Sequence, residues 1–435
     1  MEDYTSKTVI VRDGDGLFFN LAVAMSKHFG RVLYTTQTDE EYPDLTEHCL
    51  GDGFENIERC DNYLSYADEI DLFLFPGCGF FGEQELLRKM GKRVFGSGRG
   101  SEIEAYRTRF YKLLEQFGLD VPEYVVIRGV TALAKHLRPL ENKWLKMNRF
   151  RRNFETCHWR SWAENYAMLD RLAVIFGPLK ELVTFIVQDA IDDCLEIGGD
   201  FICINGRFLD YGISGIEVKN KAHAATLKPY SELPEEIRTV IEPFQQTLAD
   251  AGYRNFLSTE QRCKEKLNCW TDFTGRLGFP SGNNQIRLYQ NLPDLLWHGA
   301  EGEIVPVEFD ETCAVEILFD ACGKEMDWTS VKLPKEAVDF VNINAQCEVD
   351  GVLWSPPAGH NCDGVKTLGS ISGTGHTLKE AVENAIEVCD MLSDLPIRIL
   401  KDGVADLLKD TAEAQEEGIE VAKEPIPEPE EVVEL

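Results

Sequence analysis

The stretch Ser258–Arg276, STEQRCKEKLNCWTDFTGR, predicts a β-hairpin that carries two carboxylates, Glu260 and Asp272, on neighbouring strands. Side chains opposed across a hairpin lie close enough to share a hard cation. Thr274 and Arg276 follow Asp272 at alternating positions, so these three side chains should point to one face. Oxygen ligands beside an arginine suit Mg²⁺ and nucleotide phosphates. A surface hairpin with solvated charges is the alternative interpretation.

The composition is that of a globular protein, with 435 residues, 43% hydrophobic and 27% charged. This length predicts roughly two to four structural units. There is no apolar run of the roughly 18 residues that a membrane-spanning helix needs. The N-terminal MEDYTSKTVIVRDGDG lacks the features of a signal peptide. The 13 cysteines include no Cys-x-x-Cys pair, which favours reduced thiols in a cytoplasmic protein without membrane contact.

The formal net charge of −31 disfavours non-specific binding to nucleic acid, because the mean field repels phosphate. Part of this acidity lies in residues 401–435, where EAQEEGIEVAKEPIPEPEEVVEL carries three prolines and no apolar periodicity. We expect an extended or disordered tail there. A partner-binding tail is the alternative.

The first 100 residues predict a parallel α/β unit. Residues 8–36 have the pattern of a strand, a helix and a strand, and residues 71–97 continue it. The turn Asp13-Gly14-Asp15-Gly16 is only half of a dinucleotide fingerprint, so a tight turn is favoured over a nicotinamide-dependent enzyme. One long helix is expected over 101–117, since Gly118 and Pro122 are stop signals.

The remainder predicts a second, mostly antiparallel sheet. Consecutive strand patterns begin near residue 183, and a helix over 233–252 separates them from the hairpin. Near the end, a helix beginning after Thr377 has a capping box closed by Glu380. The predicted fold class is therefore mixed α/β and α+β.

Several polar residues outside the hairpin call for a common explanation. They lie within the long helix or at the ends of predicted strands: Arg107, Lys146, Gln188, Asp189 and Glu196. Lysine and arginine suit phosphates, a carboxylate suits a ribose, and a link between strands suits a base. Together with the hairpin acids, they predict a nucleotide site.

The order of these residues resembles the ATP-grasp superfamily, of the phosphoribosylamine–glycine ligase type. The best local matches are VFGSGRGSEIEAYRTRFYKLLEQFGLDVPEYVV at 94–126, FIVQDAI at 185–191, DFTGR at 272–276 and GHTLKEA at 375–381. The resemblance covers about residues 5–395. It implies an N-terminal α/β domain over 1–100, an ATP-grasp domain over 101–330 and a C-terminal unit over 331–400, before the tail over 401–435.

The resemblance also implies a role for each site residue. Arg107 and Lys146 would contact phosphates, and Gln188, Asp189 and Ile191 would form the adenine hinge. Glu196 would bind the ribose. Glu260, Asp272 and Thr274 would hold Mg²⁺ or Mn²⁺. Arg276, with Lys146, would act in catalysis.

The implied activity is ATP-dependent ligation of a small carboxylate, activated as an acyl phosphate, to an amine, with release of ADP and phosphate. The oligomeric state is left open, a homo-oligomer included. Three departures from the family pattern stand out: the loop Arg149–Thr156 has no glycine, Asp272 replaces a glutamate, and Thr274 replaces an asparagine. A catalytically inactive descendant that binds nucleotide or acts as an interaction protein is therefore the alternative.

Overall fold

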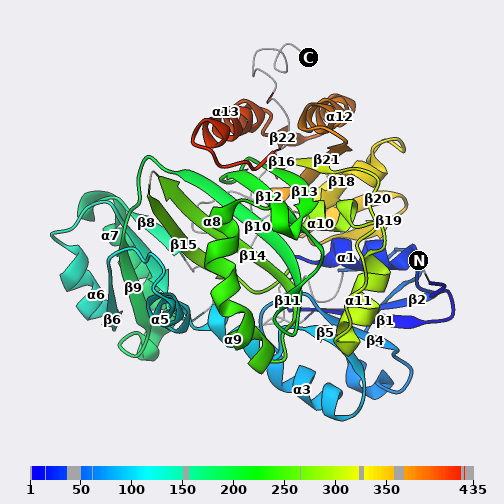
Figure 1. The fold of residues 1–435 in the computed structure, drawn as a ribbon, viewed down its shortest axis with the longest axis horizontal. Coiled ribbons are helices and arrows are strands. Elements are labelled where there is room, and N and C mark those ends of the chain that lie inside the picture. Colours follow the sequence, from blue (N-terminus) through cyan, green and yellow to red (C-terminus); the bar gives the residue numbers. More distant parts are fainter. Residues whose placement is uncertain are drawn as a thin grey trace.

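The structure is a computed structural model that describes residues 2–14, 16–36, 50–60, 62–149, 156–264, 266–322, 328–356, 367–422 and 426. Figure 1 shows N-terminal strands in blue, a small lobe in cyan, central strands in green, and two C-terminal helices across the top. Within the described residues, fifteen strands form one continuous sheet. None of the described helices is long and apolar enough to cross a bilayer.

The N-terminal part is the predicted parallel α/β unit. Its strands are β1 (Thr8–Asp13), β2 (Arg31–Thr36), β3 (Ile57–Arg59), β4 (Leu72–Phe75) and β5 (Arg93–Gly96), in the order β3-β2-β1-β4-β5. Its helices include α1 (Phe19–Ser26) and α3 (Phe81–Lys89). The strand Leu-Phe-Leu-Phe of β4 is buried throughout, as expected for a parallel sheet covered on both faces.

Antiparallel strands extend this sheet in the order β5-β14-β10-β12-β13-β16-β21-β18. Their bounds are β10 (Leu195–Ile204), β12 (Tyr211–Val218), β13 (Ala222–Pro229), β14 (Arg254–Lys264), β16 (Cys313–Ala321), β18 (Val341–Ile343) and β21 (Thr367–Gly375). Three further strands pair with members of this sheet: β11 (Arg207–Phe208) with β10, β15 (Leu267–Thr274) with β14, and β22 (Ile397–Ile399) with β16. A separate small sheet is formed by β17 (Thr329–Val331), β19 (Cys347–Val349) and β20 (Val352–Ser355). The mixed fold class predicted from the sequence is confirmed.

The small lobe is a four-stranded antiparallel sheet in the order β6-β9-β7-β8. Its strands are β6 (Tyr124–Arg128), β7 (Lys143–Met147), β8 (Thr156–Trp159) and β9 (Thr184–Asp189). Helices α6 (Val130–Leu137) and α7 (Trp162–Phe176) pack on one face and form a separate core with Leu133, Trp159 and Phe185. The other face of this sheet is turned toward the hairpin β14–β15.

The sequence predicts two continuous helices that are each divided in the structure. The segment 101–117 divides into α4 (Ser101–Ala105) and α5 (Arg107–Phe117), because Tyr106 pairs with Arg149 in a β-bridge and leaves the helical conformation. The segment 233–252 divides into α8 (Glu235–Ile241) and α9 (Gln245–Asp250) around a 3₁₀ turn that contains Pro243. Proline lacks the N–H that a continuous helix needs.

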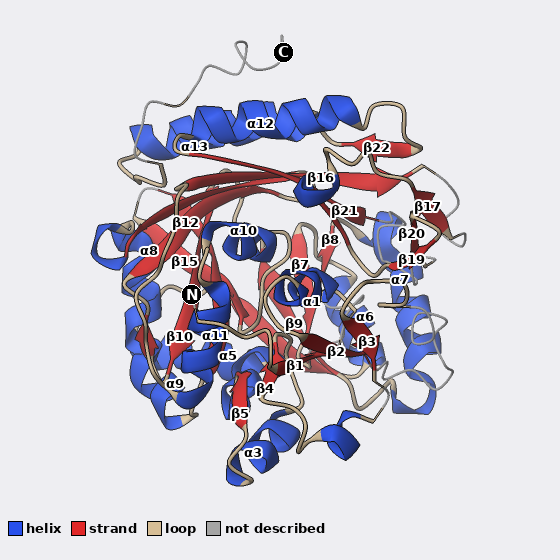
Figure 2. Cartoon of the chain, turned by 90° about the vertical axis from the view of Figure 1, so that its right-hand side faces the viewer, coloured by secondary structure: helices blue, strands red, loops and turns tan. Residues whose placement is uncertain are grey.

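Helices cover both faces of the central strands. Figure 2 shows α12 (Leu378–Met391) and α13 (Asp402–Glu416) above the sheet, with α10 (Ser281–Leu288) and α1 below it. Helix α11 (Leu292–Glu301) shares the hydrophobic core of α1 and α10. The Thr377 cap of α12 is confirmed, since its side chain accepts from the Glu380 N–H.

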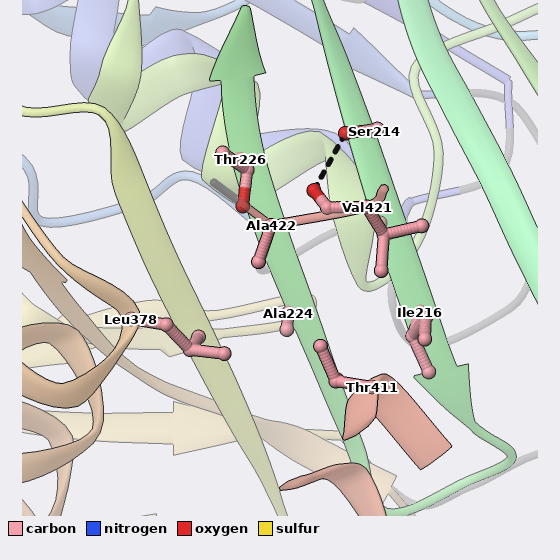
Figure 3. Close-up of a pocket in the computed structure, with 9 residues that line it drawn as sticks. Ser214, Ile216, Ala224, Thr226, Leu378, Thr411, Val421 and Ala422 are labelled. Atoms are coloured by element: carbon pink, nitrogen blue, oxygen red, sulfur yellow. Dashed lines mark hydrogen bonds between the residues drawn. The ribbon is translucent and has the colours of Figure 1, made fainter. Parts of the chain in front are cut away.

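The prediction of a disordered tail from residue 401 is wrong over residues 402–416, which form α13. Val404, Leu407 and Leu408 are buried in the main core, at the spacing of an amphipathic helix. After α13, the segment 417–422 stays against the sheet. Ser214 Oγ donates to the Val421 carbonyl at 2.8 Å, beside a small pocket lined by Ile216, Thr226 and Ala422 among others (Figure 3).

Candidate functional site

The hairpin β14–β15 brings the two predicted carboxylates together. Glu260 and Asp272 are directly opposite each other in the strand register. A β-bulge follows Glu260, because Gln261 pairs with Trp270 and leaves Thr271 as an extra residue. Like charges in this position repel each other. The pair therefore needs cations, and the structure supplies them from three other elements.

Asp272 is held by two buried cations from the small lobe and its neighbouring helix. Lys146, on β7, places Nζ 3.7 Å from Asp272 Oδ2 and donates to the Thr271 carbonyl at 2.8 Å. Arg107, at the start of α5, donates from Nη2 to Asp272 Oδ2 at 3.3 Å. Burial would raise the pKa of Asp272, but the charges of Arg107 and Lys146 outweigh it and lower that pKa to about 2. Asp272 is therefore ionised at neutral pH.

Glu260 is held by a cation that the sequence analysis did not place in the site. Lys219 Nζ lies 3.3 Å from Glu260 Oε2, 3.5 Å from Glu196 Oε1 and 3.5 Å from Glu217 Oε1. Lys219 begins the tight turn between β12 and β13, where Asn220 is left-handed with φ of 61°. The convergence of three carboxylates on Lys219 depends on strand pairing.

Glu196 lies at the edge of the same cluster. It faces Arg262 directly across β10 and β14 and forms an ion pair with it. Burial and the nearby carboxylate of Glu260 raise the pKa of Glu196 despite the cations beside it. The ribose-binding acid suggested by the resemblance is thus a partly buried member of the charge cluster that also contains Glu260.

The expected hinge residues lie at the end of β9 and in the link to β10. Gln188 is buried, and its side-chain oxygen accepts from the Tyr111 hydroxyl. Asp189 pairs with Lys143 at 2.7 Å. Ile191 lies in the link, where its carbonyl accepts from Cys194 Sγ at 3.2 Å. The side chains of Gln188 and Asp189 therefore already have protein partners, which leaves the backbone of the link for contact with a ligand.

Arg276 and Thr274 occupy the end of the hairpin. Arg276 Nε donates to Glu104 Oε1 at 2.8 Å, and Glu104 Oε2 accepts from the Gly275 N–H at 2.7 Å. Thr274 lies opposite Ser258 in the strand register, on the face that carries Asp272. Glu104 thus fixes the segment after β15. Residues 150–155 of the glycine-free loop lie outside the described residues.

The carboxylate pair fits a divalent cation that is also held by a ligand. Among the described residues, no group of three or more His, Cys, Asp or Glu side chains could hold a metal ion alone. Glu260 and Asp272 offer two carboxylates on one face. Mg²⁺ is commonly bound by one or two carboxylates together with substrate phosphates and water. The residues present match that pattern.

Comparisons with known proteins agree on the fold. No family model and no curated protein matches the sequence. Phosphoribosylamine–glycine ligase from Thermotoga maritima matches with a TM-score of 0.64 and 16% identity, over 90% of this chain and 97% of that chain. The chain has the ATP-grasp fold.

Two further solved structures share the ATP-grasp fold and carry nucleotides. Biotin carboxylase from Campylobacter jejuni, in a β-γ-ATP complex, matches with a TM-score of 0.58 and 12% identity, over 91% and 93% of the two chains. The biotin carboxylase domain of 2-oxoglutarate carboxylase from Hydrogenobacter thermophilus, with MgADP, matches with a TM-score of 0.58 and 12% identity, over 90% and 91%. The resemblance read from the sequence is confirmed at the level of fold.

Proposed function

We propose that this protein is an ATP-dependent ligase that activates a carboxylate as an acyl phosphate and joins it to an amine, with release of ADP and phosphate. The observation that carries the proposal is the placement of Lys146 and Arg107 against Asp272, with Glu260 directly opposite. Buried cations beside paired carboxylates suit a triphosphate with its divalent cation. The ATP-bound and ADP-bound structures of the same fold support this function.

Each residue would act on charge and position. Lys146 and Arg107 bind phosphate oxygens, and they exchange part of their contact with Asp272 for these oxygens. Glu196 accepts from the ribose, and the backbone of the link Gln188–Ile191 contacts the base. Phosphoryl transfer demands positioning and neutralisation of charge more than covalent help from the protein.

Glu260 and Asp272, with Thr274, would hold Mg²⁺ or Mn²⁺. A bound divalent cation supplies neutralisation of the β- and γ-phosphate charge. Arg276 would stabilise the charge that develops on the acyl phosphate, with Glu104 keeping its guanidinium in place. Lys219 neutralises Glu260 and Glu196, so that the four carboxylates of the site do not repel the nucleotide.

The test is calorimetric titration of MgADP, followed by measurement of phosphate release from ATP with a panel of carboxylates and amines. We expect MgADP to bind, and one acid–amine pair to accelerate phosphate release. Lys146→Met and Asp272→Asn should each weaken MgADP binding by about tenfold or more. Glu387→Gln, on the exposed face of α12, is the matched control for loss of one charge. Absence of MgADP binding to the unmodified protein would refute the proposal.

A nucleotide-binding protein without ligase activity is the second candidate. It is favoured by the cations that already neutralise both hairpin carboxylates, and by the glycine-free loop Arg149–Thr156. It predicts tight MgADP binding without turnover on any acid. It also predicts that Glu260→Ala and Asp272→Ala leave the cellular function intact.

A further inference from the structure

A row of polar side chains leads away from the carboxylate cluster across the inner face of the sheet. Glu217 lies opposite His223, His223 opposite Glu316, and Glu316 opposite Ser372, on β12, β13, β16 and β21. Directly opposed residues share a face, so these side chains form one line. Two strand spacings, about 10 Å, separate Glu217 from Glu316. The line begins at the candidate site, because Glu217 pairs with Lys219 at 3.5 Å.

Helix α10 covers this row with amides instead of apolar side chains. Its sequence SGNNQIRL buries Asn283, Asn284 and Gln285. Asn284 Nδ2 lies 2.9 Å from His223 Nδ1, and Asn283 Nδ2 donates to Ser370 Oγ at 3.2 Å. A helix that packs on a sheet normally buries an apolar stripe. Figure 2 shows α10 between the sheet and the N-terminal part of the chain.

Two buried oxygen atoms in and beside this row have no hydrogen-bond partner in the part of the chain that the structure describes. Glu316 and Asn284 are fully buried, yet Glu316 Oε2 and Asn284 Oδ1 have no hydrogen-bond partner among the described residues. Both atoms are acceptors in the amide orientation present. Buried polar groups are normally paired, and unpaired ones indicate water or a polar ligand. His223 stands between them, so the two acceptors belong to one cluster.

The row has an ionisable carboxyl group at each end, Glu217 and Glu316, with the uncharged His223 between them. Burial raises the pKa of Glu316 to about 8, so without a cation in contact this carboxyl group holds a proton near neutral pH, and an ammonium ion that binds beside it would displace that proton. The charge of Arg287, on α10, offsets part of this rise in pKa, but its guanidinium donates to the Asp339 carbonyl at 2.5 Å and to Asn342 Oδ1 at 3.2 Å. Burial lowers the pKa of His223, so this ring adds no positive charge at neutral pH. Lys219 already shows an ammonium group in contact with Glu217.

We propose that the row Glu217–His223–Glu316, covered by α10, binds the amine substrate of the ligase in its ammonium form. The proposal rests on the proposed function, since it names the site of the second substrate of that reaction. The ammonium group contacts the carboxylate of Glu217, and it displaces the proton of Glu316 to solvent so that this carboxylate also contacts it; the amides of α10 bind the polar remainder of the molecule. A carboxylate substrate would meet like charge in the row, and it is therefore assigned to the Lys146 and Arg107 side of the site.

The test is titration of the full-length protein with methylammonium chloride, followed by saturation-transfer NMR, with and without saturating MgADP. Sodium acetate and potassium chloride are the matched salts. We expect saturable binding of methylammonium alone. Glu316→Gln, which keeps the size of the side chain, should weaken that binding by about tenfold, as expected for a charge-assisted contact. Glu217→Gln, at a partly exposed position, should do the same, whereas Glu387→Gln should leave binding unchanged.

Binding that is equal in the three variants, or binding of acetate in place of methylammonium, would overturn the proposal. A Glu316 that serves only as a protonated structural group predicts the first of these results. Failure of the proposed function gives a different result, because MgADP would then not bind whatever the response to methylammonium. If Glu316→Gln unfolds, the Glu217→Gln arm alone decides between the outcomes.

Discussion

Glu260 and Asp272 face each other directly across the β14–β15 hairpin, yet each is neutralised from a different part of the chain. Asp272 pairs with Arg107 and Lys146, which come from α5 and the small lobe. Glu260 pairs with Lys219, which comes from the turn between β12 and β13. The hairpin thus joins two charge clusters that the sequence separates widely.

Asp272→Asn should make the protein less sensitive to acid. The pKa of Asp272 falls from its ordinary value of 3.8 to about 2 in the folded state. Its ionised form therefore contributes stability above pH 3.8, and this contribution is lost as the pH falls toward 2. The amount is on the order of 2 kcal/mol. Urea unfolding between pH 2 and pH 6 should show a shallower fall in the variant, and parallel curves would contradict the expectation.

Lys219→Met should destabilise the protein in a way that a divalent cation corrects. Without the ammonium group, Glu196, Glu217 and Glu260 lose their shared counter-ion. We expect the melting temperature to fall by a few degrees, as for the loss of a central charge contact. Millimolar MnCl₂ should restore most of it by binding to the freed carboxylates.

Lys221→Met is the control for that experiment. Lys221 lies at the end of the same turn but pairs with Asp402 at 2.7 Å and Asp406 at 3.1 Å on α13. It should show no rescue by MnCl₂. Equal rescue of both variants would mean that the cation acts elsewhere on this acidic chain.

Glu316→Gln should remove the pH dependence of stability that the buried Glu316 contributes. The folded-state pKa of Glu316 is raised from 4.5 to about 8 by burial. The folded state therefore holds a proton that the unfolded state releases, and this contribution to stability is lost as pH rises from 4.5 to 8. Relative to the unmodified protein, the variant should gain stability across this window, by a few kcal/mol in order of magnitude. Denaturant midpoints at pH 5 and pH 8 provide the measurement.

Removal of residues 402–435 should destabilise the whole fold. Helix α13 buries Val404, Leu407 and Leu408, and Lys228 donates to the Glu420 carbonyl in the segment beyond it. Loss of three fully buried aliphatic side chains costs on the order of 5 kcal/mol. A chain ended after residue 426 should keep the original urea midpoint. Equal midpoints for both truncations would show that α13 adds nothing to stability.

The local elements were predictable because they follow local rules. Alternation predicted the hairpin Ser258–Arg276, and stop signals predicted the end of α5 at Phe117. The break at Tyr106 was not predictable, since it depends on a bridge to Arg149 across the start of the small lobe. The tail prediction was wrong over 402–416 because Val404, Leu407 and Leu408 have helical spacing and bury an apolar face, whereas the prolines lie only beyond residue 424.

The sequence by itself determined the mixed fold class, the pairing of Glu260 with Asp272 and the resemblance to the ATP-grasp ligases. These depend on hydrophobic period, turn residues and short motifs, all of which are read along the chain. Tertiary structure alone decided that Lys219 lies among three carboxylates and that His223 stands between Glu217 and Glu316. The physical reason is strand register, because side chains far apart in sequence become neighbours only when the order and alignment of the strands are set.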